Sequence, residues 1–305
     1  MVSAPKYSRK VRESLGDAVF NIINYLFVTL IALTMLYPIL NVLAISLASY
    51  RDYLARPWMF ISTKLNFEGY KFIFRNDTFL RGFANSVFIT VVGTLLGLLL
   101  TILTAYPLSR RELRWKPFFT GILIFTMVFS AGMIPGYLNM QELKLTSTIW
   151  SMIIPGAFST FNCILMMNSF RELPVELIEA AEMDGASEPY ILFRVVVPLS
   201  KAVIATIALF LMVGYWNSYM GAQIYCALNR DVWPLAMILK QTLTEAATAV
   251  MNAKDDPAAK EMADKLQGKA IQYAAVVVST VPIMCVYPFL QKYFAKGALV
   301  GGVKG

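Results

Sequence analysis

The stretch Glu179-Ala-Ala-Glu-Met-Asp-Gly-Ala-Ser-Glu-Pro-Tyr-Ile-Leu-Phe-Arg-Val-Val-Val-Pro198 is acidic and interrupted by glycine, yet it lies between two long apolar runs. Such a density of ionisable groups is costly inside a bilayer. We therefore interpret it as an exposed docking loop between membrane spans, and the remaining sequence can be placed around it.

The composition predicts a membrane protein. Of 305 residues, 57% are hydrophobic and only 15% are charged, outside the usual range of soluble domains. Six segments contain no Asp, Glu, Lys or Arg: Ala18–Leu47, Ala84–Leu108, Phe118–Tyr137, Ile149–Met167, Ala202–Ala222 and Ala270–Gln291. Each comes close to the roughly 20 apolar residues that cross the hydrocarbon core as a helix. We predict an all-α polytopic protein with six transmembrane helices.

Basic residues set the predicted orientation in the cell membrane. One cluster precedes the first span, and another follows the second: Lys6, Arg9, Lys10 and Arg12, then Arg110, Arg111, Arg114 and Lys116. Lys and Arg gather on the cytoplasmic side, so both termini and the acidic loop are expected there. The first segment is too long for the apolar core of a cleavable signal peptide.

The predicted organisation follows from these spans. A cytoplasmic tail occupies residues 1–17, the transmembrane domain residues 18–291, and a second cytoplasmic tail residues 292–305. Within the domain lie the acidic loop, residues 172–198, and an extracytoplasmic insertion, residues 243–269, rich in Ala, Lys, Asp and Glu.

The acidic loop is expected to hold two short helices. Pro174 suits a first helical turn, Asp184-Gly185 suits a helix end because glycine adopts left-handed backbone, and Pro189 suits the start of a second helix. An apolar stripe is predicted from Leu173, Leu177 and Ala181 with Ile178 beside them, whereas Glu176, Glu179 and Glu182 supply negative charge. A groove with a basic rim could bind such a structure.

Several functions are disfavoured by what the chain lacks. It has no histidine and no Gly-x-x-x-x-Gly-Lys-Ser/Thr sequence, so neither His-based catalysis nor ATP binding by a phosphate loop is expected. We predict no catalytic residue, metal site or cofactor. The net charge is +8, and the basic residues that produce it lie at the flanks of the predicted helices. This distribution favours contact with membrane lipid over nucleic acid.

The order Glu-Ala-Ala, Gly185, nine residues, Val195 and Val197-Pro198 resembles the cytoplasmic coupling motif of ABC importer permeases, with Val at two positions where Ile and Leu are usual. In that family the loop seats in a groove on a separate ATPase subunit. The resemblance implies a coupling role for Glu179, Ala180, Ala181, Asp184, Gly185, Val195 and Pro198. A second Glu-Ala-Ala, Glu245–Ala247, has no glycine at that spacing and falls outside the cytoplasm in the predicted topology.

Other stretches extend the resemblance to the six-helix permeases of carbohydrate-uptake ABC transporters, in particular a Gram-positive subgroup importing oligosaccharides released from polysaccharides. They are Asn85-Ser-Val, Ala105-Tyr-Pro-Leu-Ser-Arg110, Met133-Ile-Pro135, Trp216-Asn217, Tyr293-Phe-Ala-Lys-Gly297 and Val303-Lys-Gly305. The resemblance implies alternating access and four kinds of partner: a paralogous permease, two ABC ATPase subunits, an extracellular substrate-binding lipoprotein and an oligosaccharide.

Candidate residues for the substrate path are polar or aromatic side chains within the spans. They are Tyr215, Trp216, Asn217 and Tyr219 in the fifth segment, and Ser159 and Asn162 in the fourth. For the aromatic group, an interfacial anchoring belt and sugar contact remain alternatives. Gly93 with Gly97, and Gly132 with Gly136, have the spacing of close-packed helix faces.

Two other functions remain alternatives. An ion-coupled secondary transporter needs ionisable groups or an ion site within the membrane, and the charge-free spans disfavour it. An integral-membrane enzyme needs acids or histidines clustered at the interface, and the acidic loop is the only such cluster in the sequence.

Overall fold

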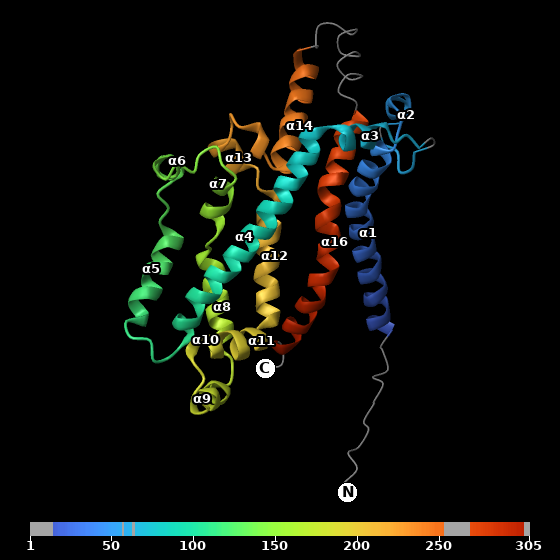
Figure 1. Ribbon diagram of the computed structural model, residues 1–305. Helices are drawn as coiled ribbons and strands as arrows, with labels where there is room; N and C mark the ends of the chain where they lie inside the picture. The colour runs from blue at the N-terminus through green and yellow to red at the C-terminus, as the bar shows by residue number, and fades with distance from the viewer. Residues whose placement is uncertain (1–14, 57, 63–64, 253–268, 302–305) are drawn as a thin grey trace.

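The computed structural model describes residues 15–56, 58–62, 65–252 and 269–301 (Figure 1). Every regular element in these residues is helical, which confirms the all-α prediction. Among the described residues, two single helices are long and apolar enough to cross a membrane, α1 (Leu15–Ser46) and α4 (Asp77–Ser109).

Three further spans are possible as bent helix pairs. α5 (Lys116–Val128) meets α6 (Met133–Glu142) at 112°, and α7 (Trp150–Ile153) with η1 (Ile154–Gly156) meets α8 (Thr160–Arg171) at 49°. The segment Glu188–Leu199 meets α12 (Lys201–Asn217) at 85°. The sixth apolar segment belongs to α16 (Lys269–Gly301), which contains the apolar stretch Ala270–Val286.

The third and fourth predicted spans are therefore not straight helices, and their own residues explain the breaks. Phe129 is extended and Gly132 has a φ of +87°, so Phe118–Tyr137 cannot continue as one helix. In the fourth segment Pro155 lies in a 3-10 turn, and the Ser159 hydroxyl accepts a hydrogen bond from the Asn162 N–H at 3.4 Å. This N-cap starts a new helix, α8.

α4 runs diagonally across the bundle and packs on α8 and α12, while α1 packs on α16 (Figure 1). A Cβ on Gly93 would lie 2.6 Å from the ring of Tyr215, and one on Gly97 would lie 3.0 Å from Leu211. Both glycines thus allow close approach of α12, as predicted. The second glycine pair does not: Gly132 has no atom within 4 Å of such a Cβ, and Gly136 only the Tyr225 hydroxyl at 3.7 Å.

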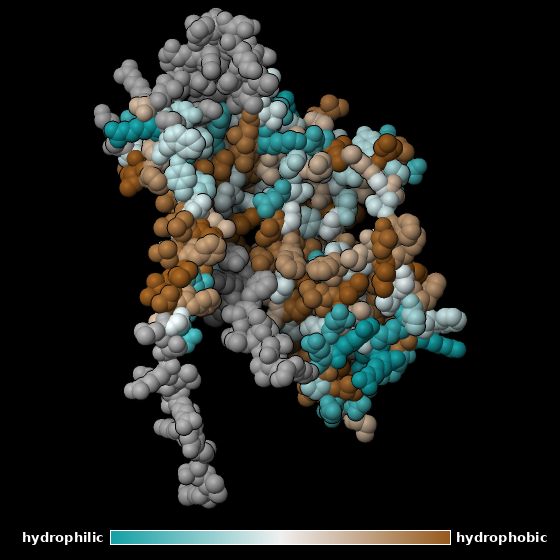
Figure 2. Space-filling view, turned by 180° about the vertical axis from the view of Figure 1, so that it is seen from behind, coloured by the Kyte–Doolittle hydropathy of each residue, from teal (hydrophilic) through white to brown (hydrophobic). Residues whose placement is uncertain are grey.

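Short elements cover the two ends of the bundle. One end carries α6, α13 (Met220–Tyr225), α14 (Leu235–Asn252), α2 (Tyr50–Ala55) and α3 (Glu68–Arg75). The other carries α9 (Val175–Met183), α10 (Glu188–Ile191) and α11 (Val197–Leu199), together with the start of α1 and the end of α16 (Figure 1). Figure 2 shows apolar side chains around the middle of the molecule and hydrophilic ones towards both ends. Most of the predicted insertion 243–269 lies outside the described residues.

Candidate functional site

The acidic loop begins with α9, whose end is built as the sequence predicts. The Gly185 N–H donates to the Glu182 carbonyl at 2.9 Å, and the Ala186 N–H donates to the Ala181 carbonyl at 3.0 Å. These two bonds define a Schellman motif, which needs left-handed backbone at the residue after the cap. Gly185 supplies it with a φ of +77°.

After this turn the chain forms a nearly continuous helical segment that leads into the membrane. α10 is followed by a π-helical turn, η2 (Leu192–Val196), and then by α11. Ile191, Leu192 and Val196 are buried in the core, so this segment is anchored on the bundle. A break at Ser200 turns the chain by 85° into α12.

The predicted coupling residues divide into an exposed set and an anchoring set. Glu179, Ala180, Asp184, Gly185 and Pro198 are exposed, whereas Ala181 and Val195 are partly buried against the core. Within the predicted apolar stripe Ile178 is buried, as expected, but Leu177 is exposed. The register of α9 on the bundle decides this, because both residues are equally apolar.

One arginine from outside the loop holds both sides of the glycine turn. The Arg110 Nη2 atom is hydrogen-bonded to Glu182 at the end of α9 and lies 3.4 Å from Glu188 at the start of α10. Tyr106 also donates its hydroxyl proton to Glu188. Glu182, predicted as part of the exposed acidic face, is thus neutralised within the chain.

The environment of Arg110 favours its charged form. Burial acts to lower its pKa, but the hydrogen bond to Glu182 and the negative charge of Glu188 act in the opposite direction, and the pKa is raised above its usual value. Its side chain is only 18% exposed, so water screens these interactions less than those of a surface pair.

Two other cations hold the end of α4, from which Arg110 projects. Lys116 Nζ donates to the carbonyls of Ser109 at 3.3 Å and Arg110 at 2.7 Å, and Arg171 donates to the Leu108 carbonyl at 3.4 Å. These bonds satisfy carbonyls that have no partner within the helix. The basic cluster was interpreted from sequence only as an orientation signal, and the stretch Ala105–Arg110 only as a family resemblance. Their role in fixing this helix end was missed.

Two of the predicted substrate-path residues have structural contacts. The Tyr215 hydroxyl donates to the Ile153 carbonyl at 2.9 Å, and the Trp216 indole N–H donates to the Ser279 carbonyl at 2.9 Å. Both side chains are buried. Each polar atom therefore already joins neighbouring helices in this conformation.

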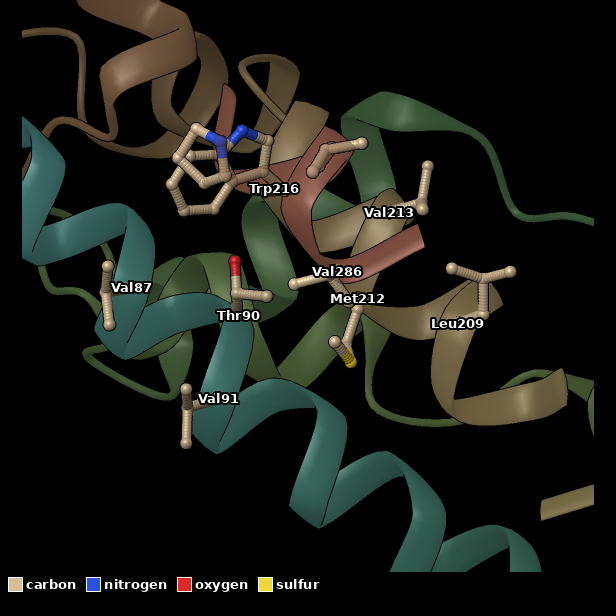
Figure 3. A pocket seen from close by; sticks show the side chains of 10 residues that line it. Val87, Thr90, Val91, Leu209, Met212, Val213, Trp216 and Val286 are labelled. Atoms are coloured by element: carbon tan, nitrogen blue, oxygen red, sulfur yellow. The ribbon is translucent and has the colours of Figure 1, made fainter. Parts of the chain in front are cut away.

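Trp216 also borders a cavity of about 240 Å³ between α4, α12 and α16 (Figure 3). Apart from the indole and the Thr90 hydroxyl, its lining is made of Val, Leu, Ile, Met and Pro side chains. The Thr90 oxygen is buried without a hydrogen-bond partner among the described residues. A sugar here could not satisfy its many hydroxyl groups, so the cavity does not suit a carbohydrate.

The other candidates lie in different settings. Ser159 caps α8 and Asn162 is buried, whereas Asn217 is exposed and Tyr219 half-buried at the end opposite the acidic loop. The Lys240 ammonium lies 4.5 Å from the centre of the Tyr219 ring and is hydrogen-bonded to Gln223. Tyr219 and Lys240 border an open cavity of about 530 Å³.

The sequence of this chain is similar to those of known transport proteins. The family described as "Binding-protein-dependent transport system inner membrane component" matches residues 93–300. The chain is 40% identical to Protein LplC of Bacillus subtilis (strain 168) over 288 residues, covering 94% of this chain and 95% of LplC. It is 38% identical over 290 residues to the polygalacturonan/rhamnogalacturonan transport system permease protein YtcP of the same organism, covering 95% and 99%.

A solved structure is also similar. It is a chain of a bacterial ABC transporter involved in the import of the acidic polysaccharide alginate, with a TM-score of 0.81 and 33% sequence identity. The match covers 92% of this chain and 99% of that one.

Proposed function

The chain belongs to the family of binding-protein-dependent transport system inner membrane components, and we propose that it is the permease of an importer for oligosaccharides. It is a membrane-embedded transport subunit and not an enzyme; ATPase subunits and a substrate-binding protein work with it. The observation that carries the proposal is the acidic loop, an exposed two-helix structure anchored to the helical bundle at one end of the molecule.

We propose that this loop docks on an ATPase subunit at the cytoplasmic face. Glu176 and Glu179 are exposed and have no ion-pair partner among the described residues, so they are free to meet a basic groove rim. Buried Ile178, Ile191 and Val196 connect the loop to the core. Force applied to the loop would therefore reach the bundle through packed side chains.

The same geometry suggests how docking could drive alternating access. The segment Glu188–Leu199 bends by 85° into α12, and α12 packs along α4 through Gly93 and Gly97. Movement of the loop would thus tilt α12 against α4. In the proposed transporter a paralogous permease supplies the other half of the path, and both termini of this chain lie in the cytoplasm beside a pair of ATPases.

Uptake of labelled oligosaccharides tests this function directly. A strain lacking this chain should lose uptake, and plasmid-borne wild-type protein should restore it. A plasmid-borne variant with residues 176–186 replaced by a Gly/Ser linker is the control that isolates the loop. Uptake that persists in the deletion strain, or full activity of the linker variant, would contradict the proposal.

The substrate class is proposed as an oligosaccharide that carries carboxylates. YtcP is named for polygalacturonan, and the similar solved transporter is described with alginate, and both are polymers of uronic acids. At the outer end of this chain a cation, an aromatic face and an amide lie together in Lys240, Tyr219 and Gln223. These are groups that bind a carboxylate and a sugar ring.

A substitution that removes the positive charge of Lys240 tests this proposal. Lys240→Met should raise the apparent KM for uptake of an oligogalacturonate by about twofold to fivefold, the size of one exposed charge contact. If this chain also carries a neutral oligosaccharide of equal length, that uptake should be unaffected. An unchanged KM for the acidic sugar would remove Lys240 from the path.

A further inference from the structure

Among the described residues, Arg110 is the side chain whose hydrogen bonds and ion pairs connect the end of a long membrane helix to both halves of the acidic loop. Its guanidinium contacts Glu182, three residues before Gly185, and Glu188, three residues after it. We propose that Arg110 is a positioning residue for coupling, which fixes the angle between α9 and the α10 segment and transmits their joint displacement to α4. This inference rests on the proposed docking of the loop and adds a second route into the bundle.

The glycine turn leaves room for such a constraint. A Cβ at Gly185 would meet nothing within 4 Å, so the glycine itself is not packed, whereas Ala181 and Ala186 on either side are partly buried against the core. The two Schellman hydrogen bonds fix how α9 ends, but they do not fix the direction in which α10 leaves. A planar guanidinium with several donors can hold two carboxylates at once in a defined geometry, which a lysine ammonium does less well.

The end of α4, from which Arg110 projects, is held by several hydrogen bonds. The carbonyl of Arg110 itself, and those of Ser109 and Leu108, are bound by Lys116 and Arg171. The Tyr106 hydroxyl, one helical turn earlier, contacts Glu188, so α4 touches the loop at two points. Displacement of the loop would therefore pull on the end of α4 instead of being lost in a flexible connection.

Two roles of Arg110 can be distinguished: it can link α4 to both halves of the acidic loop, or it can only neutralise the charges of Glu182 and Glu188. Without Arg110, Glu182 and Glu188 would face each other across the turn as like charges, which would open it. Neutralising those two acids as well would remove the repulsion but would not restore the link between α4 and the end of α9. The two explanations thus predict different behaviour for a triple variant.

The experiment compares four forms of this chain in the transporter assembled with its native ATPases, paired permease and binding protein. The variants are Arg110→Met, the triple Arg110→Met/Glu182→Gln/Glu188→Gln, and Arg111→Met as the matched control on the adjacent exposed arginine. We expect substrate-stimulated ATP hydrolysis to fall about fivefold in both variants that lack Arg110. The Arg111→Met control should keep the wild-type value. Wild-type stimulation in either variant lacking Arg110 would overturn the proposal.

A second measurement works on the purified full chain without any partner. Spin labels at positions 183 and 201, both exposed, report the distance between the end of α9 and the start of α12. Arg110→Met should broaden this distance distribution, and Arg111→Met should not. An unchanged distance distribution in Arg110→Met would refute the positioning role of Arg110, even if the transporter works as proposed. If the wild-type complex showed no substrate-stimulated ATP hydrolysis, the proposed function alone would be refuted.

Discussion

At the scale of single residues, Gly185 is where backbone conformation matters most. Its φ is +77°, and because no atom lies within 4 Å of an added Cβ, any penalty for substitution comes from backbone strain and not from crowding. Gly185→Val should cost about 1–2 kcal/mol in this conformation, or redirect α10. The variant should insert into the membrane normally, while substrate-stimulated ATP hydrolysis by the reconstituted complex falls.

Asparagine provides the control at the same position, because it tolerates left-handed backbone better than other non-glycine residues. Gly185→Asn should keep most of the stimulation. If Gly185→Val retains wild-type stimulation, the left-handed turn does not matter for coupling.

Charge at the exposed face of α9 gives a second prediction at this scale. Glu179→Lys reverses the charge offered to a basic groove rim and should weaken both ATPase binding and uptake. Glu245→Lys makes the same change at an exposed position of α14, at the opposite end of the molecule, and should be nearly neutral. Binding of the solubilised permease to its ATPase at two salt concentrations measures the effect. Equal behaviour of the two variants would argue against an electrostatic docking face.

At the scale of elements, the contact between α4 and α12 depends on small residues. Gly93→Ala would place a methyl group 2.6 Å from the buried Tyr215 ring, so the helices must separate. Overpacking of this kind costs about 1–3 kcal/mol. The thermal unfolding midpoint in detergent should fall accordingly.

Gly121 in α5 is the matched control for that substitution. No atom lies within 4 Å of a Cβ built there, so Gly121→Ala should leave the midpoint unchanged or raise it slightly, since alanine favours helix. A fall of the same size in both variants would mean that loss of glycine itself, and not the contact with Tyr215, lowers stability.

At the scale of the whole molecule, the two polar ends lead to a prediction of topology. Arg114 lines the same cavity as Glu182 and Glu188 of the acidic loop, and Leu228, 98% exposed, follows α13 at the other end. In a background with the three cysteines replaced, a cysteine at position 114 should react with an impermeant thiol reagent only after the membrane is opened. A cysteine at position 228 should react in intact cells. The reverse pattern would place the acidic loop on the side without ATP.

The sequence predicted the all-α membrane fold, the six apolar segments and the two short helices of the acidic loop. Those features depend on local chemistry: spans follow from runs without charge, and the left-handed turn follows from a glycine after a polar cap. The coupling role of the loop came from a resemblance and stays a proposal, as do the substrate-path residues.

Only the tertiary structure decided what depends on contacts between distant residues. The exposure of Leu177 beside buried Ile178, and the internal bonds of Tyr215 and Trp216, depend on how the helices pack. Arg110 is the clearest case, because two of its three ion-pair partners, Glu182 and Glu188, are 72 and 78 residues away in the sequence, and only Glu112 is local. A sequence pattern shows that an arginine follows a span, but only the folded bundle shows which carboxylates it meets, since ion pairing depends on distance in space.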